Sequence, residues 1–351
     1  MTENAPSGAA PTLPGVSYVM PVLNEVTHVR AAVNSLLQQD YDGPFEVTVA
    51  LGPSIDGTTE LLADMSARDP RIRVIENEVG STPAGLNAAI RASTYPIVIR
   101  VDAHSSLPAD YARIAVETLL ATGAANVGGI MDAQGHSSFQ KAVALAYTTR
   151  VGLGGSSFHV GGAEGPAETV YLGCFRRDAI EAVGLFDEGI KRGQDWELNR
   201  RLRAAGETVW FTPRLKVVYR PRPSLSRLAR QMFSTGLWRG ELARRFPTSN
   251  GLRYFIPPVM VIGVVLGVLL GLGGIVQAIA GVTPWLLLGF AVPAVYLLFV
   301  VVATVLATRG AGISVSAWFL LVLPCIHFCW GLGFLPGYLA LTSNIAAHTG
   351  R

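Results

Sequence analysis

The chain has 351 residues, of which 50% are hydrophobic and 15% are charged, and its mean hydropathy is +0.38. These values are too apolar for an ordinary soluble domain, and they exclude disordered, collagen-like and coiled-coil chains. Residues 1–213 carry 16 basic and 24 acidic side chains, residues 214–253 carry ten and one, and residues 254–351 carry two arginines and no acid. A basic segment beside an almost uncharged one indicates a membrane surface, rather than nucleic acid, as partner.

The N-terminal part of the chain predicts a leader followed by an α/β domain. Residues 1–15, rich in alanine, proline, glycine and serine, predict a disordered leader without a signal peptide. Within 16–222, β-rich runs at 16–20, 45–51, 72–76, 96–101 and 125–130 alternate with helical patterns at 25–39, 58–68, 82–92 and 109–122. This alternation predicts a mostly parallel sheet with helices on both faces, which binds ligands at the carboxyl ends of its strands.

The C-terminal part predicts a membrane section. Residues 223–253 set arginines among apolar side chains, which is typical of a basic amphipathic segment in the membrane interface. Three apolar stretches follow within 254–341, at 254–280, 285–308 and 313–341, each long enough to cross a bilayer, and 342–351 form a short tail. The connection at 281–284 is uncharged whereas the next contains Arg309, so the positive-inside rule predicts a cytoplasmic N-terminal domain and an external C-terminus.

A carboxylate and an imidazole, Asp102 and His104, follow the apolar run 97–101. Because they are two residues apart at a strand end, both can reach a divalent ion that would neutralise a diphosphate leaving group. Mixed oxygen and nitrogen ligands suit Mn²⁺ as well as Mg²⁺. The alternative is that Asp102 caps the following helix and His104 faces solvent.

A second charged cluster lies between Gly193 and Leu202, in a helical pattern with Asp195 in its first turn. The helix dipole would keep Asp195 ionised, and an ionised carboxylate beside an acceptor hydroxyl can act as a general base. The alternative is structural: Asp195 caps the helix, and Glu197 pairs with Arg201 four residues later.

Five short motifs occur together in an order that resembles glycosyltransferase family 2. They are Pro21-Val22-Leu23-Asn24-Glu25, Asp56-Gly57-Thr58-Thr59, the run from Gly80 to Asn87, Asp102-Ala103-His104 and Gln194-Asp195-Trp196-Glu197-Leu198. The resemblance covers about residues 16–240 and is greatest to membrane-anchored, succinoglycan-type sugar transferases. It implies a GT-A fold, that is, a Rossmann-like nucleotide-diphospho-sugar transferase head with a C-terminal all-α transmembrane section, and an inverting, metal-dependent transfer.

The resemblance also implies roles for individual residues. The implied nucleotide-sugar residues are Pro21, Asn24, Glu25, Asp56, Asn87 and Asp102, with Asp56 on the base; Asp102 and His104 are the implied metal ligands, and Asp195 the implied catalytic base. Two positions depart from the family pattern, because His104 stands where aspartate is more usual and Gln194 where glutamate is. In the basic segment, Arg230, Gln231, Trp238 and Arg239 loosely match a family segment that closes over the diphosphate. They are candidate diphosphate or acceptor contacts, with seating in the membrane as the alternative.

These features predict a multi-pass hexosyltransferase of the plasma membrane with a cytoplasmic head. Its expected donor is a nucleoside diphosphate sugar, specifically a UDP-sugar, its acceptor is lipid-linked or membrane-proximal, and its cofactor is Mn²⁺ or Mg²⁺. The expected role is cell-envelope or exopolysaccharide biosynthesis among membrane lipids, without nucleic acid. The alternatives are a polyprenyl-phosphate sugar synthase, a processive polysaccharide synthase, or a membrane scaffold or transporter with a non-catalytic head. Intact Asp102 and Asp195 speak against the last of these.

Overall fold

The computed structural model describes residues 13–249 and 251–342, so most of the predicted leader and C-terminal tail lies outside the described residues. The chain forms two compact units. The head comprises the described residues up to Ile130 together with Ala163–Val217, and the helical unit comprises Met131–Gly162 together with the residues from Val218 onward.

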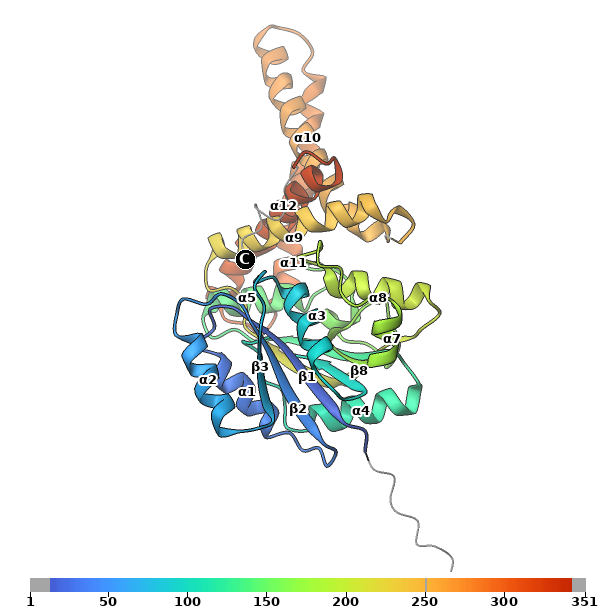
Figure 1. The fold of residues 1–351 in the computed structure, drawn as a ribbon. Helices are drawn as coiled ribbons and strands as arrows, with labels where there is room; N and C mark the ends of the chain where they lie inside the picture. The colour runs from blue at the N-terminus through green and yellow to red at the C-terminus, as the bar shows by residue number, and fades with distance from the viewer. Residues whose placement is uncertain (1–12, 250, 343–351) are drawn as a thin grey trace, which may run out of the picture. The chain divides into compact units, whose positions relative to one another are not determined.

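The head is built on a mixed sheet with the strand order β3-β2-β1-β4-β7-β5-β8-β6 (Figure 1). The strands are β1 Val16–Val22, β2 Phe45–Leu51, β3 Ile72–Glu76, β4 Ile97–Arg100, β5 Asn126–Ala133, β6 Gly165–Pro166, β7 Tyr171–Arg176 and β8 Val209–Tyr219. Strands β1 to β4 pair in parallel, whereas β7 lies antiparallel between β4 and β5. The predicted α/β head with a mostly parallel sheet is therefore confirmed.

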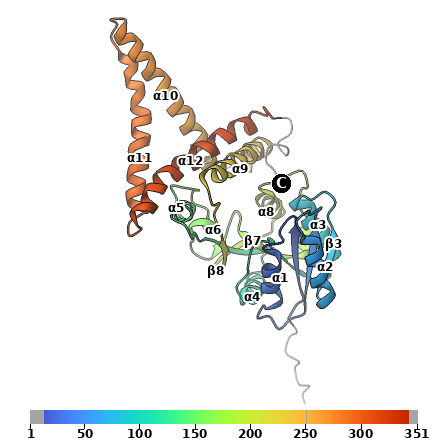
Figure 2. The same cartoon turned by 90° about the vertical axis from the view of Figure 1, so that its left-hand side faces the viewer.

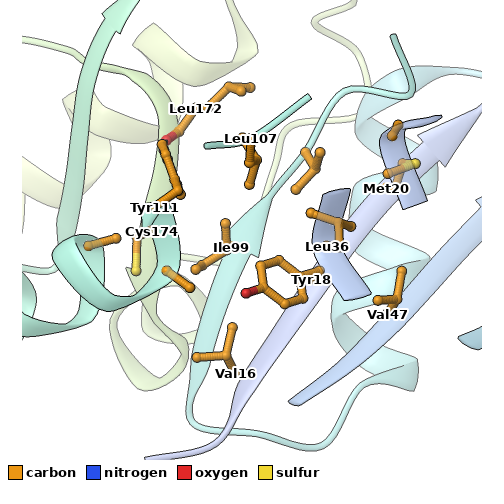
Figure 3. Close-up of a cluster of buried hydrophobic side chains, with 14 of the residues drawn as sticks. Val16, Tyr18, Met20, Leu36, Val47, Ile99, Leu107, Tyr111, Leu172 and Cys174 are labelled. Carbon is orange, nitrogen blue, oxygen red and sulfur yellow. The ribbon is translucent and has the colours of Figure 1, made fainter. Parts of the chain in front are cut away.

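Helices cover both faces of this sheet. Successive residues of a strand point to opposite sides, so the sheet has an apolar surface on each face for helices to pack against. One face carries α1 Val29–Leu37, α2 Thr58–Arg68 and α4 Tyr111–Thr122, and the other carries α3 Thr82–Ala92, α7 Arg177–Ala182 and α8 Gln194–Ala204. In β1, Tyr18 and Met20 belong to the first core and Val19 to the second. Figure 3 shows part of the first core, in which Tyr18 lies among Leu36, Ile99 and Val16.

The helical unit contains the segments that the sequence predicts to cross a membrane. Its helices are α5 Ser138–Tyr147, α6 Ser157–Val160, α9 Leu225–Arg245, α10 Ile256–Ile279, α11 Ala291–Ala307 and α12 Ile313–Tyr338. Within the described residues, three spans are long and apolar enough to cross a membrane: Leu252–Ile279, Trp285–Ala307 and Ile313–Tyr338. They coincide with the three predicted apolar stretches to within a few residues.

The basic helix α9 packs closely on α12, and the two run side by side in Figure 2. Glycines on both helices allow this approach. A methyl group at Gly236 of α9 would lie 2.0 Å from the carbonyl oxygen of Trp330, and one at Gly337 of α12 would lie 2.0 Å from that of Leu237. Small residues that let two backbones meet are typical of membrane helix pairs. The apolar face of α9 is therefore covered by protein along this crossing.

Candidate active site

The loop after β1 is tied to the loop after β2 through Asn24. Its backbone is left-handed, with φ +54°, a conformation that asparagine tolerates better than most residues. The Asn24 N–H donates to Ser54 Oγ at 3.0 Å, and Asn24 Oδ1 accepts from the Ile55 N–H at 2.8 Å. Two of the strand ends that the sequence predicts to bind a ligand are thus held together.

Asp56 connects the same two loops by its carboxylate. Its oxygens accept hydrogen bonds from the backbone N–H groups of Val26 and Thr58, both at 3.1 Å, and from the Thr58 hydroxyl. The Thr58 hydroxyl in turn accepts from the Glu25 N–H at 2.9 Å. These hydrogen bonds, above all that from the Thr58 hydroxyl, lower the pKa of Asp56. The side chain is therefore an ionised acceptor at the start of α2.

A buried arginine, Arg100, contacts both Asp102 and Asp195, the two carboxylates to which the resemblance assigns the main roles. Arg100 ends β4, and its side chain is 8% exposed. Its guanidinium donates to Asp102 Oδ1 at 2.9 Å and to Asp195 Oδ1. Burial opposes the charge of Arg100, but the two carboxylates outweigh it and raise the pKa of the guanidinium. One cation thus holds both Asp102, the predicted nucleotide-sugar residue, and Asp195, the predicted catalytic base.

Asp195 lies in the first turn of α8, after Gly193 in the left-handed conformation at φ +80°. No side-chain hydrogen bond caps α8 among the described residues, so the capping alternative does not describe Asp195. One carboxylate oxygen contacts Arg100, the other has no partner in the described part of the chain, and the side chain is 37% exposed. Glu197 instead is buried and bonded to Arg201 at 2.7 Å, the predicted structural pair. Asp195 is therefore the more exposed of the two carboxylates in this helix.

His104 faces the loop after β1. Its Nδ1 lies 3.6 Å from Glu25 Oε1, and its side chain is 41% exposed. The described residues contain no group of three or more histidine, cysteine or acidic side chains placed to hold a metal ion. Nucleotide-dependent enzymes commonly hold Mg²⁺ with one or two carboxylates and the substrate phosphates. Asp102 and His104 fit such an ion when a diphosphate supplies the remaining oxygens.

Pro21 and Asn87 lie where β1 meets α3. A methyl group at Gly85 would come within 3.0 Å of Pro21 Cβ, so the glycine lets the helix approach the strand. Asn87 is buried, and its side chain donates to the Phe186 carbonyl and to Glu188 Oε1 and accepts from the Phe186 N–H, each at 2.9 Å. Asn87 thereby fixes the segment that leads to α8. Its contact with a nucleotide sugar stays a prediction.

The four candidate contacts on α9 belong to the helical unit. Gln231 donates to the Tyr219 hydroxyl at 3.0 Å and accepts from Arg222 Nε at 3.2 Å. Trp238 is buried, Arg230 is exposed, and the Arg239 guanidinium lies 3.4 Å from the centre of the Tyr254 ring. Their contact with a diphosphate or an acceptor also stays a prediction.

Arg100 is the site residue that the motifs do not indicate. A signal for it exists in the sequence, since an arginine interrupts the otherwise apolar run Ile97–Val101. Arginine is rarely buried unless acidic groups pair with it. A buried strand that ends in arginine therefore predicts carboxylates nearby, but it does not say which ones.

Comparison with known proteins gives a consistent result. The model of glycosyl transferase family 2 matches residues 17–184. The succinoglycan biosynthesis protein ExoA of Rhizobium meliloti (strain 1021) is 36% identical over 243 residues, 68% of this chain and 73% of that protein. A Methanococcus voltae protein, named dolichyl N-acetyl-alpha-D-glucosaminyl phosphate 3-beta-D-2,3-diacetamido-2,3-dideoxy-beta-D-glucuronosyltransferase, is 25% identical over 239 residues, 66% of this chain and 74% of that protein.

A solved structure shares the fold. The mannosyltransferase PcManGT from Pyrobaculum calidifontis, in complex with GDP-Man and Mn²⁺, has a TM-score of 0.56 at 18% identity. The match covers 94% of this chain and 90% of that one. A match of this extent includes helices of the helical unit as well as the head.

Proposed function

This chain belongs to glycosyl transferase family 2, and we propose that it transfers a sugar from a UDP-sugar to a lipid-linked or membrane-proximal acceptor. The proposed setting is cell-envelope or exopolysaccharide biosynthesis. The name of the Rhizobium relative, a succinoglycan biosynthesis protein, supports that setting, and the GDP-Man in the mannosyltransferase structure supports a nucleotide-sugar donor. A polyprenyl-phosphate sugar synthase is the nearest alternative within the class.

One observation carries the proposal: Arg100 holds Asp102 and Asp195 together while leaving one oxygen of Asp195 open. In the proposed reaction, Asp195 Oδ2 accepts the proton of the acceptor hydroxyl as its oxygen bonds to the anomeric carbon. The bond from that carbon to the diphosphate oxygen breaks on the opposite side, and the nucleoside diphosphate leaves as an anion. One carboxylate suffices for an inverting transfer of this kind, and the contact with Arg100 orients it.

Asp102 and His104 are the proposed ligands of a divalent ion, Mn²⁺ or Mg²⁺, together with the donor diphosphate. Such an ion, when bound, neutralises charge on the diphosphate. Pro21, Asn24, Glu25, Asp56 and Asn87 complete the proposed nucleotide-sugar site, and Arg230, Gln231, Trp238 and Arg239 are the proposed diphosphate or acceptor contacts. The tied loops of Asn24 and Asp56 support a preformed nucleotide site, because their backbone is already fixed.

The proposed location is the plasma membrane, with three passes and a cytoplasmic head. The charge of Arg309 and of the basic segment supports this orientation. Single cysteines at Ser249 and Ala347, in a chain whose native cysteines are replaced, can be labelled from each side of sealed vesicles. Three passes require opposite sides, and labelling of both positions from one side would overturn the count.

The function is tested with the purified full chain and a panel of UDP- and GDP-sugars in Mn²⁺ or Mg²⁺, by measuring released nucleoside diphosphate and transferred sugar. Asp195→Asn keeps the shape of the side chain, so donor affinity should persist while transfer falls about 10²–10⁴-fold. Asp178→Asn is the matched control, since Asp178 also lies in the first turn of a helix and pairs with an arginine, Arg176 at 3.1 Å. Near-native transfer by Asp195→Asn would refute the assignment. Wild-type protein that turns over no donor would instead indicate a non-catalytic head.

A further inference from the structure

Three aromatic side chains of the helical unit form a cluster that the proposed chemistry does not use. Tyr147 ends α5, His159 lies in α6, and Tyr219 ends β8. The rings of Tyr147 and Tyr219 are stacked with centres 5.9 Å apart, and the His159 ring lies 6.3 Å from that of Tyr147. We call these three residues the tyrosine cluster.

Two polar atoms of the tyrosine cluster are buried without a hydrogen-bond partner in the described part of the chain. They are the Tyr147 hydroxyl and His159 Nδ1, and Tyr147 as a whole is 2% exposed. Native proteins seldom leave such groups unpaired, because each costs free energy comparable to a lost hydrogen bond. A group from outside the chain that supplied the missing partner would remove this cost.

Both residues are uncharged at neutral pH. Burial, with a smaller contribution from Tyr219, raises the pKa of Tyr147 well above its ordinary value, so its hydroxyl keeps its proton. Burial lowers the pKa of His159 to about 4, so its ring is neutral. Tyr147 therefore offers a hydrogen-bond donor.

Further donors converge on the same place through Gln231. The Gln231 amide donates to the Tyr219 hydroxyl at 3.0 Å, and the ring of Tyr219 stacks on that of Tyr147. The Gln231 oxygen accepts from Arg222 Nε at 3.2 Å, and the two terminal nitrogens of Arg222 have no partner among the described residues. A guanidinium and the Tyr147 hydroxyl, which both donate, match a ligand with several acceptor oxygens and a negative charge.

The composition of the helical unit further limits the class of ligand that suits this site. Residues 131–162 and 218–351 contain twelve basic side chains but two acidic ones, Asp132 and Glu241. Glu241 is engaged by Arg244 and Arg245, and Asp132 accepts from Gln134 at 2.6 Å. The same unit carries the three apolar spans. Its chemistry therefore suits a molecule with an anionic head and a long apolar chain.

We propose that the tyrosine cluster, with Gln231 and Arg222, binds the phosphate of a lipid-linked acceptor. The identity of this lipid as the acceptor rests on the proposed function; the phosphate site itself rests on the two unpartnered atoms and the donors around them. The donor diphosphate is the other source of phosphate in the reaction, and the experiment distinguishes the two.

The test measures binding of farnesyl phosphate, without a sugar donor, to the full chain in detergent. Tyr147→Phe removes only the unpartnered hydroxyl, so the melting temperature should stay the same or rise while farnesyl phosphate binds about tenfold more weakly. Arg222→Gln should weaken binding at least as much. Farnesol, which has the same chain and no phosphate, should bind poorly to the wild-type protein.

Tyr18→Phe is the matched control, because Tyr18 is a fully buried tyrosine of the head whose hydroxyl also has no partner in the described residues. It should not lower stability, and it should not change the binding of farnesyl phosphate. The proposal is overturned if Tyr147→Phe and Arg222→Gln bind farnesyl phosphate as the wild type does, if farnesol binds equally well, or if these variants lose affinity for UDP instead. Because no donor is present, absence of transferase activity would not alter this result.

Discussion

The two units each bury a polar cluster, and the clusters differ in where the hydrogen-bond partners come from. In the head, the two terminal nitrogens of Arg100 are paired within the chain with Asp195 and Asp102, whereas its Nε has no hydrogen-bond partner among the described residues. In the helical unit, Tyr147 and His159 keep buried atoms that no described residue satisfies. The first arrangement fixes side chains in one geometry before any substrate arrives, and the second stays incomplete until a ligand arrives. The comparison predicts that substitutions in the first cluster change stability, whereas substitutions in the second change binding.

Removal of divalent ions should have the largest effect on activity, and it should affect the reaction of the head but not binding to the tyrosine cluster. With a chelator in excess, release of nucleoside diphosphate should fall to background. Asp102→Ala should abolish turnover and weaken nucleotide binding, whereas His104→Ala should mainly raise the metal concentration that activity requires. Binding of farnesyl phosphate should not change with chelator, because hydrogen-bond donors form that site. Full activity in chelator, with both variants unaffected, would contradict the metal assignment.

Replacement of Arg100 should cost the most stability. Arg100→Met leaves Asp102 and Asp195 without their shared cation. Breaking a fully buried ion pair costs about 3–5 kcal/mol, and the loss here should lie toward or below the lower end because Asp195 is partly exposed. Hydrogen exchange of the β4 and α8 amides in the full chain would report the loss. Arg113→Met is the control, since Arg113 also contacts two carboxylates, Asp40 and Glu117, but on the surface. That change should cost less than about 1 kcal/mol, and equal losses for the two variants would show that the Arg100 pairs contribute little.

Removal of a single tyrosine hydroxyl should lower stability in the head but not in the tyrosine cluster, and the difference should be smaller than that expected for Arg100. Tyr111 of the head donates to the Leu172 carbonyl at 2.6 Å, so Tyr111→Phe leaves a buried acceptor unpaired and costs about 1–3 kcal/mol. Tyr147→Phe removes a hydroxyl without a described partner and should cost close to nothing. Thermal unfolding of both variants measures the difference. A clear loss of stability in Tyr147→Phe would mean that its hydroxyl already has a partner.

Local patterns were enough to predict most of the head. Strands β2 and β3 and helices α2 and α3 have the predicted bounds, because each has clear periodicity and ends at turn residues. Helix α1 begins later than predicted, at Val29, since the preceding residues form the loop that binds Ser54. The antiparallel insertion of β7 between β4 and β5 depends on pairs such as Ile97 with Arg176, and no local pattern reveals a contact at that separation.

The site was predictable in part, for a related reason. Motifs single out Asp102 and Asp195 because their residue types and neighbours are distinctive. They do not show that one arginine joins the two, because that contact requires β4 and α8 to meet. The tyrosine cluster is less visible still, since its residues come from α5, α6 and β8 and no motif connects them. Whether a hydroxyl lacks a partner is decided by packing, which the sequence pattern does not describe.

Stability should depend on pH through His159 of the tyrosine cluster, and this effect should be the smallest of those expected. Burial holds the pKa of His159 near 4 in the folded chain, below its ordinary value of 6.5. Between these values the unfolded chain binds the extra proton, so the contribution of His159 is complete above pH 6.5 and is lost as the pH falls toward 4. Between pH 6.5 and 5.5 the loss is about 1 kcal/mol, because a full proton corresponds to about 1.4 kcal/mol per pH unit.

His159→Gln should remove this pH-dependent contribution. The free energies of unfolding of the variant and the wild type, measured in urea, should therefore converge as the pH falls. Burial raises the pKa of Tyr147 further above this range, so Tyr147 does not interfere. A wild-type and variant difference that stays constant from pH 7 to 5 would show that His159 reaches solvent and that the cluster is not buried as described.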